Sequence, residues 1–286
     1  MSLFQPYDPG EDERPRRARR LLQPVPVRSV LPSLVTLLAL CAGLTSIRMS
    51  IEHHYELAIV FVAVAALLDA IDGRIARLLK SMSRFGAELD SIADFVNFGV
   101  APAILVYVWT LDDLGRLGWM GVLVYVICAA LRLARFNVAL DVPDKPSWQA
   151  GFFVGVPAPA AAMTVMLPLY AEFMGVPVPH GLVEAPIVLV YVMAIGVLMV
   201  SRLPTFSGKL IGWRIARDRV APLFVAGVLV VASLVSFPWD TITVLALVYL
   251  GSLPSAWRSY QRHRQADEAA APVPSDGIPS AGGPAP

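Results

Sequence analysis

The sequence predicts an all-α protein, a polytopic integral membrane bundle of roughly eight spanning helices. Composition is the first indication, because 56% of the 286 residues are apolar and only 16% are charged. The mean hydropathy of +0.63 is far above that of ordinary soluble domains. The second indication is that the apolar residues form separate runs of about 20, the length that crosses a bilayer as a helix.

The runs define each candidate span in order along the chain. A tail of about 28 residues, rich in Arg and Pro, precedes the first run and lacks the small-residue cleavage pattern of a signal peptide. We therefore expect the first run to remain in the mature protein. The eight predicted spans cover residues 31–49, 55–79, 84–110, 117–140, 153–174, 183–201, 220–237 and 240–256.

The positive charges give the orientation. Of the 23 Lys and Arg residues, 21 fall in tails and loops on one side of the predicted spans, and only Arg48 and Arg116 fall on the other. The positive-inside rule then places both termini in the cytoplasm. The basic residues lie at membrane edges rather than on one face, so we expect contacts with anionic membrane lipids and no nucleic-acid partner. Cys41 and Cys128 lie inside spans and predict no disulfide framework.

Three regions follow from these patterns. Residues 1–28 form a basic cytoplasmic tail, and residues 29–260 form one membrane-embedded domain. Residues 261–286 are predicted to be a disordered tail, because most of this stretch consists of Pro, Ala, Gly and Ser.

Four carboxylates stand out between the second and third spans. Asp69 and Asp72 lie near the end of the second span, and Asp90 and Asp94 lie near the start of the third. Residues three or four apart share a helix face. A tight turn at 80–84 would therefore bring the two pairs face to face at matching depth, on the cytoplasmic side.

This arrangement predicts a metal site. Carboxylates within a bilayer cost about 2.5–3.5 kcal/mol each and are usually functional. Four of them in close proximity would repel one another unless cations neutralised them. Ligation by oxygen alone selects Mg²⁺ or Mn²⁺, with Ca²⁺ able to substitute. Four shared carboxylates suit two ions that clamp a phosphoryl group.

The residues between the carboxylates fit a phosphate-bearing substrate. Gly73, Ala76 and Gly86 leave room for a ligand to approach the helix backbone, although glycine in membrane helices also serves helix packing. Arg77 lies on the face of Asp69 and Asp72 and can pair with phosphate.

The window from residue 69 to residue 94 resembles the signature of the CDP-alcohol phosphotransferase family, D-x2-D-G-x2-A-R-x8-G-x3-D-x3-D. The matching residues are Asp69, Asp72, Gly73, Ala76, Arg77, Gly86, Asp90 and Asp94. The resemblance implies transfer of a phosphatidyl-type group from a CDP-linked lipid to an alcohol, with release of CMP. It also implies a homodimer with a six-helix catalytic core, here with about two further spans. The four aspartates would hold two metal ions, and Asp94 would deprotonate the acceptor.

Three other segments resemble the bacterial phosphatidylserine synthase branch of that family, in which CDP-diacylglycerol is the donor and L-serine the acceptor. They are RLARFN at 132–137, GVPAPAA at 155–161 and LMVSRLPTFSGK at 198–209. The first span is similar to the family's opening helix and retains Thr36 as a contact to the CDP-lipid. It departs from the family pattern at Ser33 and Ala39, where Asn is usual or frequent.

Recognition of serine requires a group that binds its carboxylate, and a guanidinium does so well. Arg132, Arg135 and Asn137 are the candidates at the end of the fourth span, although anchoring of the membrane edge would also account for the two arginines.

Two alternatives remain open from the sequence. The same chemistry could use glycerol 3-phosphate, inositol phosphate or choline as the acceptor. A divalent-cation transporter would also carry intramembrane carboxylates. A transporter predicts polar residues along a path to the far side, whereas the third span is almost wholly apolar after Asn97.

Overall fold

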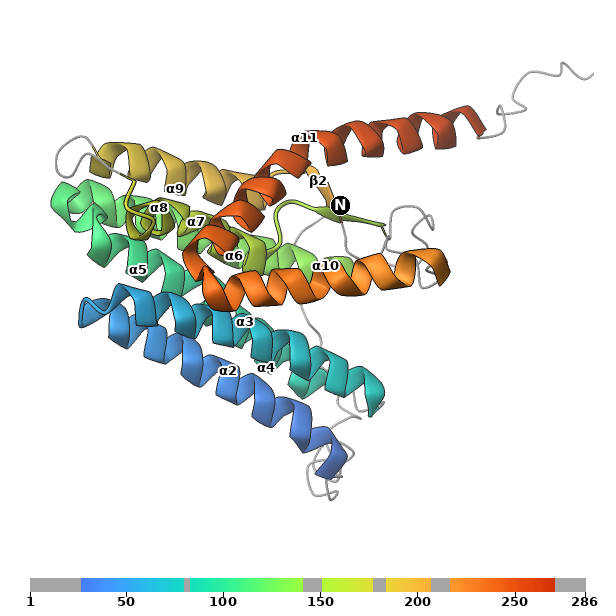
Figure 1. The fold of residues 1–286 in the computed structure, drawn as a ribbon, viewed down its shortest axis with the longest axis horizontal. Helices are drawn as coiled ribbons and strands as arrows, with labels where there is room; N and C mark the ends of the chain where they lie inside the picture. Colours follow the sequence, from blue (N-terminus) through green and yellow to red (C-terminus); the bar gives the residue numbers. More distant parts are fainter. Residues whose placement is uncertain (1–26, 80–82, 141–150, 177–183, 207–216, 271–286) are drawn as a thin grey trace, which may run out of the picture.

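The computed structural model describes residues 27–79, 83–140, 151–176, 184–206 and 217–270, and these are almost entirely helical. The helices form a bundle in which neighbouring helices run alongside one another (Figure 1), which confirms the predicted fold class. Within the described residues, three helices are long and apolar enough to cross a membrane: Val30–Ile51, Arg84–Trp109 and Arg116–Ala139. Glu184–Val200 and Val220–Ser236 are shorter apolar helices.

The first two helices form a hairpin. Helix α2 spans Val27–Ile51 and helix α3 spans Tyr55–Leu78. The turn between them contains His53 with φ of 61°. The buried hydroxyl of Ser46 donates to the carbonyl of Ala58 at 2.8 Å and ties the hairpin together at the turn. The opposite end of α3 carries the first two aspartates, so α2 becomes one wall of the site.

The third predicted span is one continuous helix with a change of winding. It comprises α4 (Arg84–Asp94), the π-helical segment η2 (Phe95–Val100) and α5 (Ala101–Trp109). Ser83 caps its start, since the hydroxyl accepts the backbone N–H of Gly86 at 3.0 Å. The π-helical segment begins directly after Asp94, a placement frequent at functional sites.

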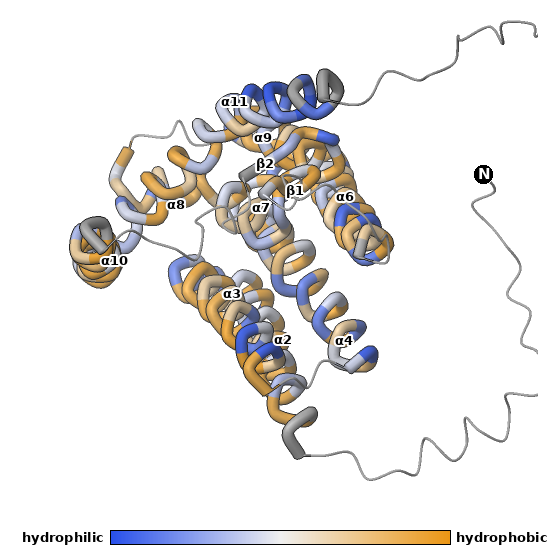
Figure 2. The backbone as a smooth tube through the Cα atoms, turned by 90° about the vertical axis from the view of Figure 1, so that its right-hand side faces the viewer, coloured by the Kyte–Doolittle hydropathy of each residue, from blue (hydrophilic) through white to orange (hydrophobic). Residues whose placement is uncertain are grey.

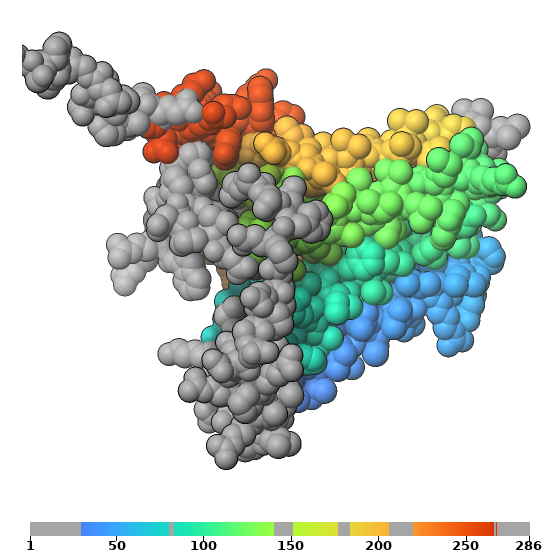
Figure 3. Space-filling view, turned by 180° about the vertical axis from the view of Figure 1, so that it is seen from behind, coloured from blue at the N-terminus to red at the C-terminus, as the bar shows by residue number. Residues whose placement is uncertain are grey.

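Helix α6 (Arg116–Leu140) and helix α9 (Glu184–Val200) pack on each other, with η3 (Leu111–Leu114) preceding α6. Seen from behind, segments from α2 to α9 lie side by side in chain order (Figure 3). The largest fully buried side chains of the core include Tyr125, Tyr170, Phe98, Leu105 and Met166.

The fifth predicted span, 153–174, is wrong as a single helix. It comprises strand β1 (Phe152–Val154), helix α7 (Ala158–Val165) and helix α8 (Leu167–Phe173). Proline is the reason, because it donates no backbone hydrogen bond and stands near the start of both α7 and α8. Strand β1 pairs antiparallel with β2 (Pro204–Phe206), a feature that hydrophobic runs do not reveal.

The last two helices are α10 (Arg217–Ser236) and α11 (Pro238–Ala270). Helix α10 stands at the edge of the bundle (Figure 2) and is exposed along almost all of its described length. Helix α11 crosses the bundle and packs on α7, α8 and β2.

The predicted disordered tail begins too early. Residues 261–270 continue α11, because this stretch is rich in helix-forming Gln, Arg, Ala and Glu and has no proline. Residues 271–286, the rest of that predicted tail, and residues 1–26 of the N-terminal tail lie outside the described part of the chain.

Candidate metal and phosphate site

Three of the four predicted carboxylates meet where the last turns of α3 lie beside α4. Asp69, Asp72 and Asp90 each offer an oxygen, and these oxygens lie within 4.8 Å of one another. Asp72 is buried, with 4% of its surface exposed, and the other two are half-buried. The predicted juxtaposition of the two helix ends is therefore confirmed for these three residues.

Asp94 lies one helical turn further along α4 than Asp90. Its carboxylate interacts with Asp69 and Asp90. Its Oδ1 atom is buried and has no hydrogen-bond partner among the described residues. A buried carboxylate oxygen without a partner is costly, and the cost is offset if the oxygen binds a cation. The all-oxygen donor set and this oxygen fit a divalent ion such as Mg²⁺ or Mn²⁺.

Helix α2 orients one of these carboxylates. The buried hydroxyl of Thr36 donates to Oδ2 of Asp72 at 2.6 Å, and it also lies 3.0 Å from the carbonyl of Pro32. The shorter distance indicates that the carboxylate is the main acceptor. Thr36 therefore supports a metal-site residue, a role that its place in the sequence pattern did not reveal.

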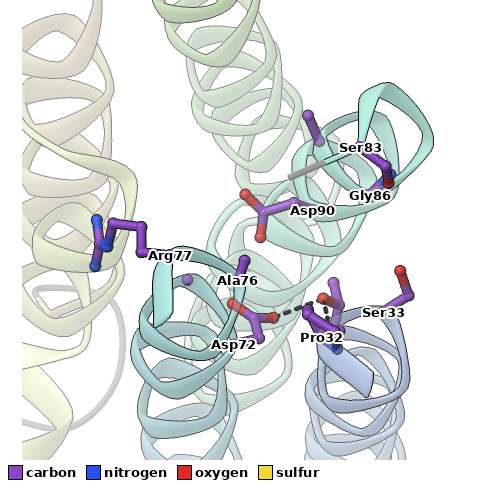
Figure 4. A pocket seen from close by; sticks show the side chains of 11 residues that line it. Pro32, Ser33, Asp72, Ala76, Arg77, Ser83, Gly86 and Asp90 are labelled. Atoms are coloured by element: carbon purple, nitrogen blue, oxygen red, sulfur yellow. Dashed lines mark hydrogen bonds between the residues drawn. The ribbon is translucent and has the colours of Figure 1, made fainter. Parts of the chain in front are cut away.

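A cavity of about 200 Å³ opens beside these residues between α2, α3 and α4 (Figure 4). Asp72 and Asp90 line it, as does Ser33, one of the two departures from the family pattern. Its walls include all five residues predicted to contact the CDP-lipid: Thr36, Gly73, Ala76, Arg77 and Gly86. The guanidinium of Arg77 points away from Asp72 and Asp90 in this view.

The glycines of the cavity differ in what surrounds them. A Cβ added to Gly73 would meet no atom within 4 Å, so helix packing does not require glycine there. A Cβ added to Gly86 would lie 3.1 Å from the Ser83 hydroxyl, which caps α4. The space at Gly73 is available to a ligand, and this favours the substrate interpretation of that residue over the packing one.

Arg132 of α6 is a second residue that interacts with Asp94. It is buried, with 8% of its surface exposed. It interacts electrostatically with Asp94 and Tyr249. Its guanidinium carbon lies 5.4 Å from the ring centroid of Phe136, and the side chain makes no hydrogen bond within the described residues. A buried guanidinium with free donors is suited to an anionic ligand.

Arg135 and Asn137 have partners within the protein. Arg135 donates to the backbone carbonyls of Val200, Met199, Ser201 and Val154 at 2.7–3.4 Å. The Nδ2 group of Asn137 donates to Ser91 at 2.9 Å and ties α6 to α4. These bonds give Arg135 a structural role, and its predicted role in serine binding stays a prediction. Its donors bind carbonyls at the carboxyl end of α9 and one carbonyl of β1, and so hold α6, α9 and β1 together.

The three segments that resemble the synthase branch converge around Arg135. Arg135 bonds to carbonyls of the third segment and to that of Val154, which directly precedes the second segment. The N–H of Gly155 donates to the carbonyl of Leu203 at 2.8 Å, and the hydroxyl of Thr205 donates to the carbonyl of Gly155 at 3.1 Å. Gly155 has φ of 78°, and a Cβ there would overlap the carbonyl of Met199, so only glycine fits. Residues 207–209 of the third segment lie outside the described residues.

One buried polar residue close to Asp94 in the chain was not predicted as a site residue. Asn97, in η2, is 1% exposed, and neither its Oδ1 nor its Nδ2 has a partner among the described residues. It packs against Gly43 of α2, where a Cβ would overlap the amide. The sequence marks Asn97 only as a single amide side chain within an otherwise apolar run.

Comparison with known families gives two matches along the chain. The family model described as CDP-alcohol phosphatidyltransferase matches residues 29–201. A second model, described as CDP-alcohol phosphatidyltransferase 2, matches residues 219–254. The second match covers most of α10 and the first half of α11, the part of the chain that carried no recognisable motif.

Three bacterial relatives are similar to most of the chain, and each is named CDP-diacylglycerol–serine O-phosphatidyltransferase. The protein of Mycobacterium leprae is 41% identical over 230 residues, which cover 79% of this chain and 74% of the relative. That of Mycobacterium tuberculosis is 39% identical over 233 residues, covering 80% and 79%. That of Helicobacter pylori is 34% identical over 224 residues, covering 77% and 87%.

Proposed function

The chain belongs to the CDP-alcohol phosphatidyltransferase family, and we propose that it transfers the phosphatidyl group of CDP-diacylglycerol to the hydroxyl of L-serine, releasing CMP. The observation that carries the reaction class is the carboxylate cluster beside a cavity lined by the signature residues. The choice of serine is supported by the names of the relatives. Glycerol 3-phosphate, inositol phosphate and choline are the alternative acceptors.

Asp69, Asp72, Asp90 and Asp94 would hold two divalent ions, Mg²⁺ or Mn²⁺ with Ca²⁺ able to substitute. When bound, such ions polarise the phosphoryl oxygens and stabilise the CMP leaving group. Thr36 keeps Asp72 in one orientation through the 2.6 Å hydrogen bond, so that this ligand is already positioned.

The donor lipid would occupy the cavity between α2, α3 and α4. Gly73 and Ala76 leave the α3 backbone accessible to the pyrophosphate, and Gly86 does the same on α4. Arg77, at the edge of the cavity, would turn its guanidinium toward a phosphate oxygen. The outward faces of α2 carry exposed apolar residues such as Leu34 and Leu38, which suit the acyl chains.

Asp94 would act as the general base. Its carboxylate has two oxygens: Oδ1, which has no partner among the described residues, would bind the cation, and the other would accept the proton of the serine hydroxyl. The serine oxygen then bonds to the phosphorus of the diacylglycerol phosphate. The bond from that phosphorus to the bridging oxygen breaks, and the electron pair leaves with CMP.

The remaining parts of the proposal concern assembly and orientation. The protein would be a homodimer in the bacterial inner membrane, with both termini and the cavity on the cytoplasmic side, where the Lys and Arg residues concentrate. This orientation suits the water-soluble substrate serine and the product CMP.

An acceptor assay tests the proposal. Purified protein is given CDP-diacylglycerol, Mn²⁺ or Mg²⁺, and either L-serine or glycerol 3-phosphate, and CMP release is followed. We expect release with serine, and no release with serine would refute the assignment. Asp94→Asn should abolish turnover with normal expression, whereas an active variant would exclude Asp94 as the base.

A further inference from the structure

The π-helical winding of η2 has a cause in the sequence. At the end of this segment the backbone N–H of Ala101 donates to the carbonyl of Val96, five residues back rather than four. The next residue is Pro102, which has no backbone N–H to donate. In an α-helix that N–H would bond to the carbonyl of Phe98, and the proline ring would also crowd this oxygen. A wider turn before the proline relieves the crowding.

Tyr125 of α6 binds the carbonyl that the proline leaves without its α-helical donor. The hydroxyl of Tyr125 donates to the carbonyl of Phe98 at 3.2 Å, and both residues are fully buried. A buried carbonyl without a donor would cost free energy, because it has also lost its contact with water. The hydroxyl of Tyr125 therefore stabilises the wide turn of η2 from the side of α6.

Close packing also holds η2 against its neighbours. Helix α6 approaches Gly99, where an added Cβ would lie 3.2 Å from the Cβ of Ala129. Helix α2 approaches Asn97, because an added Cβ on Gly43 would overlap its amide. That amide is buried and has no partner among the described residues, so the segment carries an energetic cost. Local structure that carries such a cost is typical of functional sites.

Asp94 depends on η2 more than the other carboxylates of the site do. It is the last residue of α4, and η2 begins with the residue that follows it. Earlier in α4, Asn137 of α6 donates at 2.9 Å to Ser91, which is the neighbour of Asp90. The other two carboxylates lie on α3. The winding of η2 therefore sets the direction of Asp94, whereas Asp90 is held in place by a separate bond.

We propose that Tyr125 is a positioning residue for Asp94: through the carbonyl of Phe98 it keeps η2 in the winding that sets the direction of the Asp94 side chain. This inference rests on the proposed function, in which Asp94 binds a cation and accepts the proton of the acceptor hydroxyl. Tyr125 acts through the backbone of η2 and takes no part in the chemistry itself. Pro102 is the second residue on which the winding depends, because it removes the competing α-helical bond.

Tyr125→Phe tests the inference, with Tyr191→Phe as the matched control. The hydroxyl of Tyr191 also donates to a backbone carbonyl within the bundle, that of Thr164 in α7, at 2.6 Å. Both variants should lower the melting temperature in detergent, since each loses one hydrogen bond. Only Tyr125→Phe should lower kcat, by about 10- to 100-fold, because a small misplacement of a reacting group is enough for such a loss. The KM for CDP-diacylglycerol should stay unchanged, since the α4 residues that line the donor cavity precede the bond to α6.

Two further measurements distinguish positioning from a merely structural role. Mn²⁺ binding without substrates, followed by the electron paramagnetic resonance signal of the free ion, should weaken about tenfold or more in Tyr125→Phe and stay unchanged in Tyr191→Phe. Pro102→Ala supplies an N–H that can bond to the carbonyl of Phe98 and so favours α-helical winding. In this variant kcat should fall although the melting temperature does not, a combination that loss of packing alone would not give.

The possible outcomes are distinct. A well-folded Tyr125→Phe variant with the kcat and the Mn²⁺ affinity of the wild type would overturn the inference and leave the proposed function intact. An equal loss of kcat in Tyr191→Phe would also overturn it. If the wild type releases no CMP with serine, the proposed function fails, and Mn²⁺ binding still decides whether Tyr125 positions Asp94. Should Tyr125→Phe not be monodisperse on size exclusion, Pro102→Ala replaces it, and full activity of that variant would overturn the inference.

Discussion

The hydrogen bond from Thr36 to Asp72 offers a quantitative test of the metal site. Thr36→Val keeps the shape of the side chain but removes the donor that lies 2.6 Å from Oδ2 of Asp72. A hydrogen bond to a charged group contributes about 1.5–3 kcal/mol, and about 1.4 kcal/mol corresponds to a factor of ten. We expect the apparent affinity for Mn²⁺ to fall about 10- to 100-fold, the range seen when partners of metal ligands are removed.

The measurement is CMP release as a function of free Mn²⁺ at saturating lipid and serine. Excess Mn²⁺ should restore most of the activity of Thr36→Val, because the ligand itself is retained. Thr45→Val is the control, since Thr45 lies on the same helix and its hydroxyl donates at 2.7 Å to the carbonyl of Cys41, within α2. If Thr36→Val shows the Mn²⁺ dependence of the wild type, Asp72 is not a metal ligand held by Thr36.

Three further predictions concern packing, support of the site and metal removal. Gly43→Ala should lower stability by about 1–3 kcal/mol, since the new Cβ overlaps Asn97; thermal unfolding in detergent measures this, and Gly227→Ala, where a Cβ meets nothing within 4 Å, should not lower it. Arg135→Lys should cost about 2 kcal/mol or more, because one ammonium cannot replace the donors to four carbonyls; an unchanged melting temperature would contradict the support role. Chelation of divalent ions should abolish CMP release and added Mn²⁺ or Mg²⁺ should restore it, whereas full activity under chelation would exclude a metal site.

The carboxylate cluster could be predicted from the sequence because its geometry is local. Spacings of three and four place Asp69 with Asp72 and Asp90 with Asp94, and a short turn sets the pairs at one depth. The same window also contains Gly73, Ala76 and Gly86, which were predicted to leave room for a ligand and which line the cavity. The long spans could also be predicted from the sequence, because a run of about 20 apolar residues is characteristic of a helix that crosses a bilayer.

Other features depend on contacts between distant segments and could not be predicted. Arg132 and Arg135 are three residues apart and looked equivalent in the sequence. Arg135 donates to the carbonyls at the end of α9, whereas Arg132 is buried, interacts electrostatically with Asp94 and makes no hydrogen bond among the described residues. This difference depends on where the last carbonyls of α9 lie, and the sequence of α6 gives no information on that.

The broken fifth span has a similar cause. Its composition is that of a membrane helix, but Gly155 requires a positive φ and the prolines near the starts of α7 and α8 interrupt the hydrogen bonding.

The transfer itself can be followed with labelled L-serine and CDP-diacylglycerol in mixed micelles, measuring labelled lipid and CMP in the same sample. The proposed mechanism predicts equal amounts of the two products, both requiring serine and a divalent ion, and neither formed by Asp94→Asn. Release of CMP at an undiminished rate without serine, or labelled lipid without CMP, would contradict it.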